Sequence, residues 1–275
     1  MASHSSNDLL PAQYVSEPDF IQIRDVVMNL SYYKDIVDVN VVGWFYWIDH
    51  VIFHELLKNV QKDITGDIAE LGTANGKSAI AISNYKRQSD NLYLFDISQE
   101  FAESANTNII HYGTPHNIHW HVQDSYSMTS DDIKVNKLRF MHIDGAHEHT
   151  PVLKDILNFS QHVADNGVMV LDDFNDPEYI GVQSAVIHFL LENQKWVMFA
   201  NGQNKAYLCK REFYNFYALS LLDQLEKIKS GCGLNFSFNL REVIDCNVVL
   251  FNSRGAQTAQ FCRENLNKKL SYTST

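Results

Sequence analysis

Long apolar runs are missing from this 275-residue sequence. No stretch approaches the roughly 18 apolar residues that a membrane-spanning helix requires. The first ten residues, MASHSSNDLL, have neither the basic region nor the apolar core of a signal peptide. We therefore expect a cytoplasmic protein without a membrane partner.

Basic residues and cysteines are also scarce. The chain has 22 Lys and Arg against 33 Asp and Glu, a formal net charge of -11, which disfavours nucleic acid because its binders need basic faces. The four cysteines show no CxxC spacing, so neither a zinc site nor a disulfide framework is indicated. A hydrophobic share of 45% still marks a folded globular chain. We therefore expect a small molecule as the substrate.

Three carboxylates stand at the ends of two apolar runs in the middle of the chain. Residues 138–143 stop at Asp144, and residues 168–171 stop at Asp172 and Asp173. Between the runs, apolar residues at helical spacing predict a helix that begins near Thr150-Pro151 and ends at Asn166-Gly167. The pattern predicts a strand-helix-strand unit.

Such a crossover joins parallel strands, whose carboxyl ends open on the same edge of the sheet. The three aspartates are therefore expected to converge, and like charges held together are usually neutralised by a hard divalent cation. Mg²⁺ is the first expectation, with Mn²⁺ or Ca²⁺ also suited to oxygen ligands. The alternative is structural: Asp172 caps the following segment and Asp173 is solvated.

His147 lies three residues after Asp144, in the loop over the same edge. A histidine titrates near neutral pH and could take a proton from a metal-bound hydroxyl. The alternative is a histidine that only hydrogen-bonds its loop. Four further histidines, His111, His116, His119 and His121, have no cysteine or carboxylate to complete a metal set and are interpreted as ordinary side chains.

A second motif occupies residues 66–87, GDIAELGTANGKSAIAISNYKR, where a short strand leads into a glycine loop and then a helix. Gly72 and Gly76 let the backbone approach a ligand, and the helix start offers free N–H groups. The loop fits neither the P-loop nor the GxGxxG pattern. A second strand over residues 92–95 ends at Asp96, where an acid accepts hydrogen bonds from ribose hydroxyls.

The flanking segments predict a mixed sheet with added helices. Residues 18–60 predict two or three helices, with aromatic residues 44–47 either packing on the sheet or forming a wall or lid beside a substrate. Residues 117–125 predict a third strand. Two β runs around Asn201-Gly202 predict an antiparallel hairpin at the end of the sheet. An amphipathic helix follows over residues 213–228, then two β runs and a short helix.

This order of elements resembles that of class I S-adenosylmethionine (SAM)-dependent methyltransferases over about residues 66–211. Within that superfamily, IDGAH followed by LDDF resembles the magnesium-dependent O-methyltransferases, most closely the macrocin-type enzymes that methylate sugar hydroxyls of natural products. The implied fold is an α/β, Rossmann-like, doubly wound sheet, mostly parallel, with an antiparallel terminal hairpin, N-terminal helices and a C-terminal extension. The implied cofactors are SAM and Mg²⁺.

The resemblance also implies roles for individual residues. The SAM-binding set would be Glu70, Gly72, Thr73, Gly76, Ser78, Asp96, Asp124 and Ser125. Asp96 would hold the ribose, and Asp124 with Ser125 would meet the adenine. The metal ligands would be Asp144, Asp172 and Asp173, with His147 as the general base.

The expected organisation is a flexible segment over residues 1–16, a helical cap or lid over 17–62, a methyltransferase core over 63–211, and a C-terminal helix and extension over 212–275. Apolar content at the two ends favours a homodimer. The expected activity is cation-assisted O-methylation of a small hydroxylated molecule. The alternatives are a metal-independent N- or carboxyl-methyltransferase, a non-catalytic SAM-binding scaffold, and a nucleotide-dependent oxidoreductase, which the glycine spacing disfavours.

Overall fold

A computed structural model describes residues 16–252 and 257–268 of the chain. The predicted flexible segment 1–16 therefore lies outside the described residues except for Ser16. Within the described ranges, no helix has the length and apolar character to cross a bilayer.

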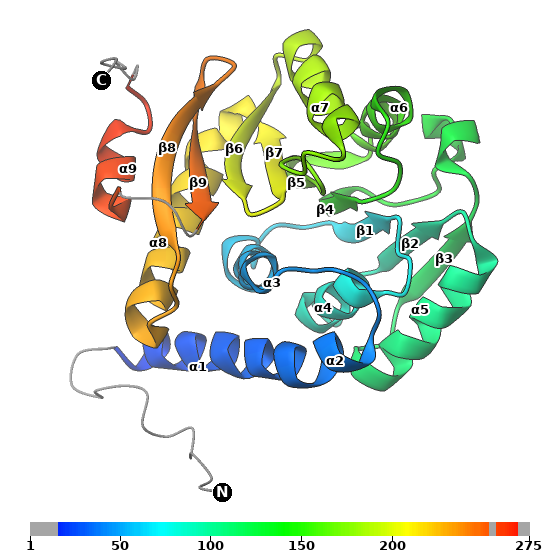
Figure 1. The fold of residues 1–275 in the computed structure, drawn as a ribbon, viewed down its shortest axis with the longest axis horizontal. Coiled ribbons are helices and arrows are strands. Elements are labelled where there is room, and N and C mark those ends of the chain that lie inside the picture. Colours follow the sequence, from blue (N-terminus) through cyan, green and yellow to red (C-terminus); the bar gives the residue numbers. More distant parts are fainter. Residues whose placement is uncertain (1–15, 253–256, 269–275) are drawn as a thin grey trace, which may run out of the picture.

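Nine strands of the described chain form one sheet (Figure 1). They are β1 Asp67–Leu71, β2 Leu92–Asp96, β3 Ile118–Val122, β4 Leu138–Ile143, β5 Val163–Leu171, β6 Trp196–Gly202, β7 Lys205–Lys210, β8 Ser237–Val243 and β9 Cys246–Asn252. Their order is β3-β2-β1-β4-β5-β7-β6-β9-β8. The first five in this order pair in parallel, and β7 pairs antiparallel with both β5 and β6.

Helices cover both faces of the sheet. The longer ones are α1 Glu17–Tyr32, α3 Trp47–His54, α4 Lys77–Tyr85, α5 Gln99–Tyr112, α6 His149–Phe159, α7 Ile180–Glu192, α8 Tyr214–Cys232 and α9 Ala259–Asn265. Shorter helical turns are η1 Tyr33–Val37, α2 Asp38–Asn40, η2 Glu55–Val60, η3 Ser125–Ser127, η4 Ser130–Asp132 and η5 Arg211–Phe213. Buried apolar residues form one cluster under α3, α4 and α8 and another under α6 and α7. The predicted Rossmann-like, doubly wound fold with its antiparallel hairpin is confirmed.

The helix predicted to run to Asn166-Gly167 is shorter in the structure. Helix α6 ends at Phe159, and β5 begins at Val163. Leu138 pairs with Val163, and the register between β4 and β5 shifts before Phe140 pairs with Val168. Asn166-Gly167 lies at this shift, where a Cβ on Gly167 would come within 2.7 Å of the Leu138 carbonyl oxygen. The Asn-Gly pair therefore allows the close approach of β5 to β4 at the register shift and does not end the helix.

The C-terminal β runs continue the same sheet. Strand β9 pairs in parallel with β6, and β8 pairs antiparallel with β9. The predicted hairpin of β6 and β7 therefore lies inside the sheet, and β8 forms the edge. Sequence patterning identified both late β runs but did not place them.

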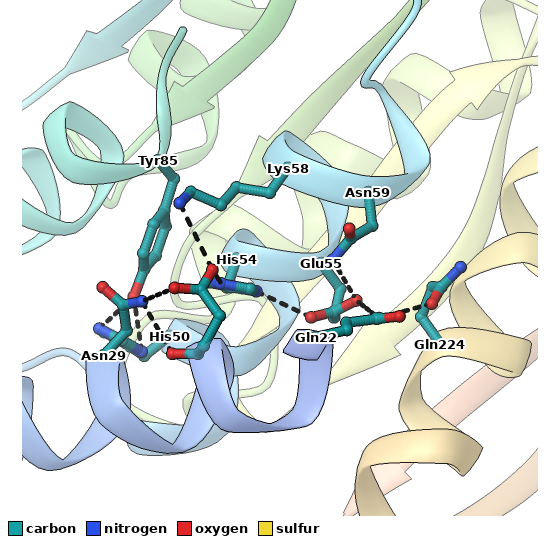
Figure 2. A network of polar contacts seen from close by, with 10 residues as sticks. Gln22, Asn29, His50, His54, Glu55, Lys58, Asn59, Tyr85 and Gln224 are labelled. Carbon is teal, nitrogen blue, oxygen red and sulfur yellow. Dashed lines mark hydrogen bonds and ion pairs between the residues drawn. The ribbon is translucent and has the colours of Figure 1, made fainter. Parts of the chain in front are cut away.

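A partly buried polar network joins α1 to α3 and η2 (Figure 2). The imidazole of His54 lies between two carboxylates, with Nε2 2.9 Å from Asp25 and Nδ1 2.7 Å from Glu55. Gln22 donates to Glu55, which ties the network to α1 a second time. Because His54 is only 1% exposed, these bonds are made largely out of water. The network fixes α1 against α3 and η2.

Replacing Asp25 with asparagine is expected to lower the free energy of unfolding by about 1 kcal/mol, less than a fully buried charged bond, because Asp25 is 44% exposed. The hydrogen bond from His54 holds the pKa of Asp25 down at about 2. Burial alone would lower the pKa of His54, but its bonds to Asp25 and Glu55 raise it above 6.5.

The Asp25 contribution is therefore present above pH 3.8 and lost as the pH falls toward 2. The His54 contribution is present below pH 6.5 and lost as the pH rises through its raised folded-state pKa. Urea unfolding of the wild type and of Asp25→Asn should show the largest difference in free energy of unfolding between pH 3.8 and pH 6.5, where both contributions are present. Asp223→Asn, at an exposed ion pair with Arg263, is the control and should change the free energy of unfolding only slightly.

Candidate active site

The carboxyl ends of β1, β2, β4 and β5 lie next to one another at one edge of the sheet. Backbone bonds continue past the strand ends: the N–H groups of Gly72, Asp144 and Asp172 donate to Phe95, Leu71 and Ile143 at 2.8, 2.8 and 2.9 Å. The first residue of each loop is thereby held in register with its neighbour. This is the edge at which open α/β sheets bind ligands.

A cavity of about 810 Å³ opens at this edge. Ten of the predicted site residues line it: Gly72, Thr73, Ser78, Asp96, Asp124, Ser125, Asp144, His147, Asp172 and Asp173. Gly76 lies between two lining residues, Asn75 and Lys77. Glu70 does not line the cavity, because it is fully buried behind it and bonds His142. A second hollow, of about 850 Å³, lies around Gly66 and Asp67 at the amino ends of the strands, away from this edge.

The glycine loop between β1 and α4 has a left-handed backbone at three positions. Gly72, Ala74 and Gly76 have φ angles of +83°, +46° and +82°. This winding lets the Ala74 N–H donate to Asp96 at 2.8 Å, while the other Asp96 oxygen accepts from the Ser98 N–H at 2.8 Å. Gly76 is the N-cap residue of α4, so the free N–H groups of that helix start open toward the cavity.

Replacing Gly72 with alanine is expected to damage both the fold and the cavity. A Cβ there would lie 1.8 Å from the Asp144 carbonyl oxygen, and φ is +83°. Backbone must therefore move, at a cost of several kcal/mol given the usual 1–2 kcal/mol for a left-handed non-glycine residue alone. Thermal unfolding should show a large drop in Tm. Gly233→Ala is the control: φ is also positive, but nothing lies within 4 Å of the added Cβ, so its loss should be smaller.

The three strand-end aspartates form two overlapping groups with metal-ligand spacing. Asp144 belongs to both: one group adds His142 and Asp172, and the other adds His147 and Asp173. In each group the ligand atoms lie within 4.8 Å of one another. Burial and the neighbouring Asp172 raise the pKa of Asp144 well above its usual range. The site therefore holds more negative charge than its surroundings favour.

Asp172 is already occupied by protein donors. Its Oδ1 accepts from the Asp173 N–H at 2.8 Å, and its Oδ2 forms an ion pair with Nζ of Lys205. Burial alone would raise the pKa of Asp172, but Lys205 and His142 hold it below its ordinary value. His142 in turn bonds Glu70 at 2.8 Å through Nδ1. Burial and Lys205 would lower the pKa of His142, but Asp172 and Glu70 raise it to about 9.

His147 lies at the mouth of the cavity, 38% exposed. Its Nε2 is 2.9 Å from Asp173 Oδ2, and its ring stacks on Tyr179 at 4.0 Å. The bond to Asp173 raises its pKa. The other Asp173 oxygen accepts from Asn204 at 2.5 Å, and Asp173 itself has a left-handed backbone, with φ of +58°. The imidazole is thus oriented by a carboxylate that is itself fixed.

The donor set fits a hard divalent cation. A ligand atom of Asp144 lies within 4.8 Å of ligand atoms of Asp172 in one group and of Asp173 in the other. Nε2 of His142 is buried without a hydrogen-bond partner in the part of the chain that the structure describes, and it lies 3.7 Å from Asp172. The carboxylate oxygens of Asp144, Asp172 and Asp173 are the kind of ligand that suits Mg²⁺ or Mn²⁺.

Sequence reasoning missed two residues of the site, Lys205 and His142. Each is a polar residue within an apolar strand, and that interruption was the available signal. His142 stands in LRFMHI and Lys205 opens KAYLCK. Both were interpreted as ordinary members of buried strands, since no motif contains them.

The aromatic stretch is divided between the sheet and the cavity. Trp47 starts α3, which is buried against the sheet, whereas Trp44, Phe45 and Tyr46 precede the helix and line the cavity. Nζ of Lys77, the first residue of α4, donates to the Gly43 carbonyl oxygen at 2.8 Å. The aromatic loop is thereby tied to the helix that follows the glycine loop.

Comparisons with known proteins support the fold and the core. Residues 69–174 match the family described as a methyltransferase domain. No curated protein matches the chain. Cofactor-bound Rv0187 from MTB is 12% identical with a TM-score of 0.52, covering 73% of this chain and 93% of that one. The O-methyltransferase NovP is 11% identical with a TM-score of 0.54, covering 70% and 99%.

At such identities the two solved structures are informative about fold alone. The family match, by contrast, extends from β1 through the glycine loop to Phe174 and includes all three strand-end aspartates. The match identifies a methyltransferase domain over residues 69–174, and the sheet that carries this domain is the Rossmann-like sheet described above.

Proposed function

We propose that the protein methylates a hydroxyl group of a small molecule, using SAM and a divalent cation. The observation that carries the proposal is the position of His147: it lines the same cavity as the glycine loop and is held 2.9 Å from Asp173, beside Asp144. A histidine oriented by a carboxylate is suited to accept a proton from a hydroxyl. SAM, when bound, supplies an activated methyl group, so no covalent enzyme intermediate is needed.

In this proposal Gly72, Thr73, Gly76 and Ser78 shape the SAM site, Asp96 accepts hydrogen bonds from the ribose, and Asp124 with Ser125 meets the adenine. Glu70 lies outside the cavity lining and orients His142 through their hydrogen bond. Asp144, Asp172 and Asp173 would hold Mg²⁺ or Mn²⁺, which would favour the deprotonated acceptor oxygen. His147 removes the proton, and the loop of residues 44–46 shields the cavity from water.

The lining charges favour a neutral or amine-bearing acceptor, such as a sugar or natural-product hydroxyl, over a phosphate ester. Seven carboxylates line the cavity: Asp96, Asp124, Asp144, Asp172, Asp173, Asp176 and Glu178. The two lining lysines, Lys77 and Lys205, already bond Asp38 and Asp172. An anionic acceptor would meet no free lysine in this lining.

We further propose that residues 17–62 act as a cap over the core of residues 63–211, with residues 212–275 as an extension. Ile21 and Met28, seven residues apart on α1, are exposed and would suit a homodimer contact. A cytoplasmic location remains our expectation.

One observation favours a second candidate, a metal-independent N- or carboxyl-methyltransferase. Lys205 already neutralises Asp172, so the acid cluster is partly compensated without a cation. In that case the aspartates would be structural, and the nucleophilic nitrogen or carboxylate of the acceptor would need no cation to activate it.

The test has two parts. Thermal shifts with SAM and its demethylated product should exceed those with NAD and NADP. Methyl transfer to a panel of hydroxylated acceptors should fall to background in EDTA and return with Mg²⁺ or Mn²⁺. Full activity in EDTA would reject the cation and support the second candidate. Absence of any SAM-dependent shift would reject the cofactor assignment, whereas a SAM-dependent shift without methyl transfer to any acceptor would favour the non-catalytic SAM-binding scaffold.

A further inference from the structure

Lys205 is an uncommon residue for the floor of a cavity. It is the first residue of β7 and only 1% exposed. Lysine is rarely buried to this degree unless its charge is paired. Its Nζ forms an ion pair with Asp172, and it lies 5.3 and 6.0 Å from the ring centroids of Phe45 and Phe53. The ammonium is thus a fixed positive charge within the acid cluster.

The Lys205 ammonium bonds an oxygen of Asp172 that a divalent cation would need as a ligand. Both oxygens of Asp172 accept from nitrogen donors, the Asp173 N–H and Lys205. The Asp173 N–H belongs to the backbone next to Asp172, whereas the Lys205 ammonium ends a flexible side chain, so the Lys205 bond is the one that a side-chain movement can exchange. A cation beside Asp172 would also repel the ammonium.

A second partner for Lys205 is available nearby. Asp49 on α3 is completely buried, and its Oδ1 accepts from the Tyr207 hydroxyl at 3.2 Å. Its Oδ2 has no hydrogen-bond partner among the described residues. Asp49 and Lys205 already attract one another, and this attraction partly opposes the burial that raises the pKa of Asp49 to about 7. A carboxylate oxygen is costly to bury unless a hydrogen-bond donor or a positive charge can interact with it.

We propose that Lys205 is the resident counter-ion of the acid cluster and competes with a divalent cation for Asp172, with Asp49 as its alternative partner. The inference rests on the proposed cation-assisted function. In the absence of a cation, Lys205 keeps Asp172 compensated. When a cation binds, the ammonium exchanges Asp172 for Asp49. Lys205 is therefore a positioning residue that sets the affinity of the site for metal.

The first test is titration of the full chain with Mn²⁺ in the presence of SAM, monitored by calorimetry and by the Mn²⁺ electron paramagnetic resonance signal. Lys205→Met should bind Mn²⁺ about tenfold or more tightly, because a like charge a few ångströms away is removed. Lys205→Arg should keep the wild-type affinity because it keeps the charge. Lys210→Met is the matched control: it lies on the same strand, pairs with Asp165 and should change nothing.

The second test begins with Asp49→Asn, which keeps Lys205, so its first result does not depend on the folding of Lys205→Met: unchanged Mn²⁺ binding in Asp49→Asn would overturn the exchange. Asp49→Asn in the wild-type background should weaken Mn²⁺ binding, since the displaced ammonium loses its alternative partner. In the Lys205→Met background the same change should have a smaller effect. Equal weakening in both backgrounds would reflect plain loss of a negative charge and would overturn the exchange.

The outcomes separate the inference from the function on which it rests. Mn²⁺ binding that is equal or weaker in Lys205→Met than in wild type overturns the inference and leaves the cation proposal intact. Binding by Lys205→Met alone supports the inference and means that the wild-type lysine excludes the metal. Binding by none of the variants overturns both.

Discussion

Asp144→Ala is expected to abolish cation-dependent methyl transfer while leaving SAM binding largely intact. Asp144 is the single residue common to both groups with metal-ligand spacing, so its loss leaves neither group complete. The affinity for Mg²⁺ or Mn²⁺ should fall at least about 100-fold, since even residues that only support a metal ligand contribute 10- to 100-fold. SAM binding should persist because the glycine loop and Asp96 lie on neighbouring loops with bonds of their own.

Calorimetry with SAM and with Mn²⁺, beside an activity assay, measures the three quantities separately. Asp165→Ala is the matched control, because it removes an exposed acid from the opposite edge of the sheet. Unchanged cation affinity in Asp144→Ala would remove the strand-end acids from the metal site. Loss of SAM binding together with activity would instead indicate a collapsed cavity.

His147→Asn is expected to lower kcat by about 10²- to 10⁴-fold, the usual contribution of a general base. Asparagine can still hydrogen-bond Asp173, so the loop should keep its position while the proton acceptor is lost. The affinities for SAM and Mn²⁺ should therefore stay near those of the wild type. Initial-rate assays at saturating acceptor, with SAM and Mn²⁺ binding measured separately, isolate the effect on kcat.

His149→Asn is the control for this substitution. His149 lies two residues further along and bonds Ser184 and His188 on α7, outside the cavity lining. Its replacement should leave kcat unchanged. If His147→Asn retained full kcat but lost Mn²⁺ affinity, His147 would be a metal ligand, as its place beside Asp144 and Asp173 permits, and another group would take the proton.

The core of the fold was predictable because its signals are local. Apolar runs that stop at Asp96, Asp144 and Asp172 identify strands and their carboxyl ends without reference to the rest of the chain. Parallel crossovers then dictate that these ends share one edge. Ten of the predicted residues line one cavity for this reason.

The remainder depends on contacts between distant segments. Lys205 meets Asp172 only because β7 pairs with β5, and that pairing has no signature in either strand. Glu70 stands on the strand before the glycine loop, but the alternation of side chains along β1 turns it toward His142 and away from the cavity. The Asn166-Gly167 pair has the residues of a helix stop, yet the register of β4 against β5 decides its use.

The parallel pairing of β6 with β9 has a consequence for synthesis on the ribosome. Strand β6 acquires its outer neighbour only when residues 246–252 have been translated, more than 40 residues after β6 itself. Until then the nascent chain carries an unprotected apolar edge, the kind that recruits other chains. Chaperone demand during translation should therefore be concentrated in this late interval.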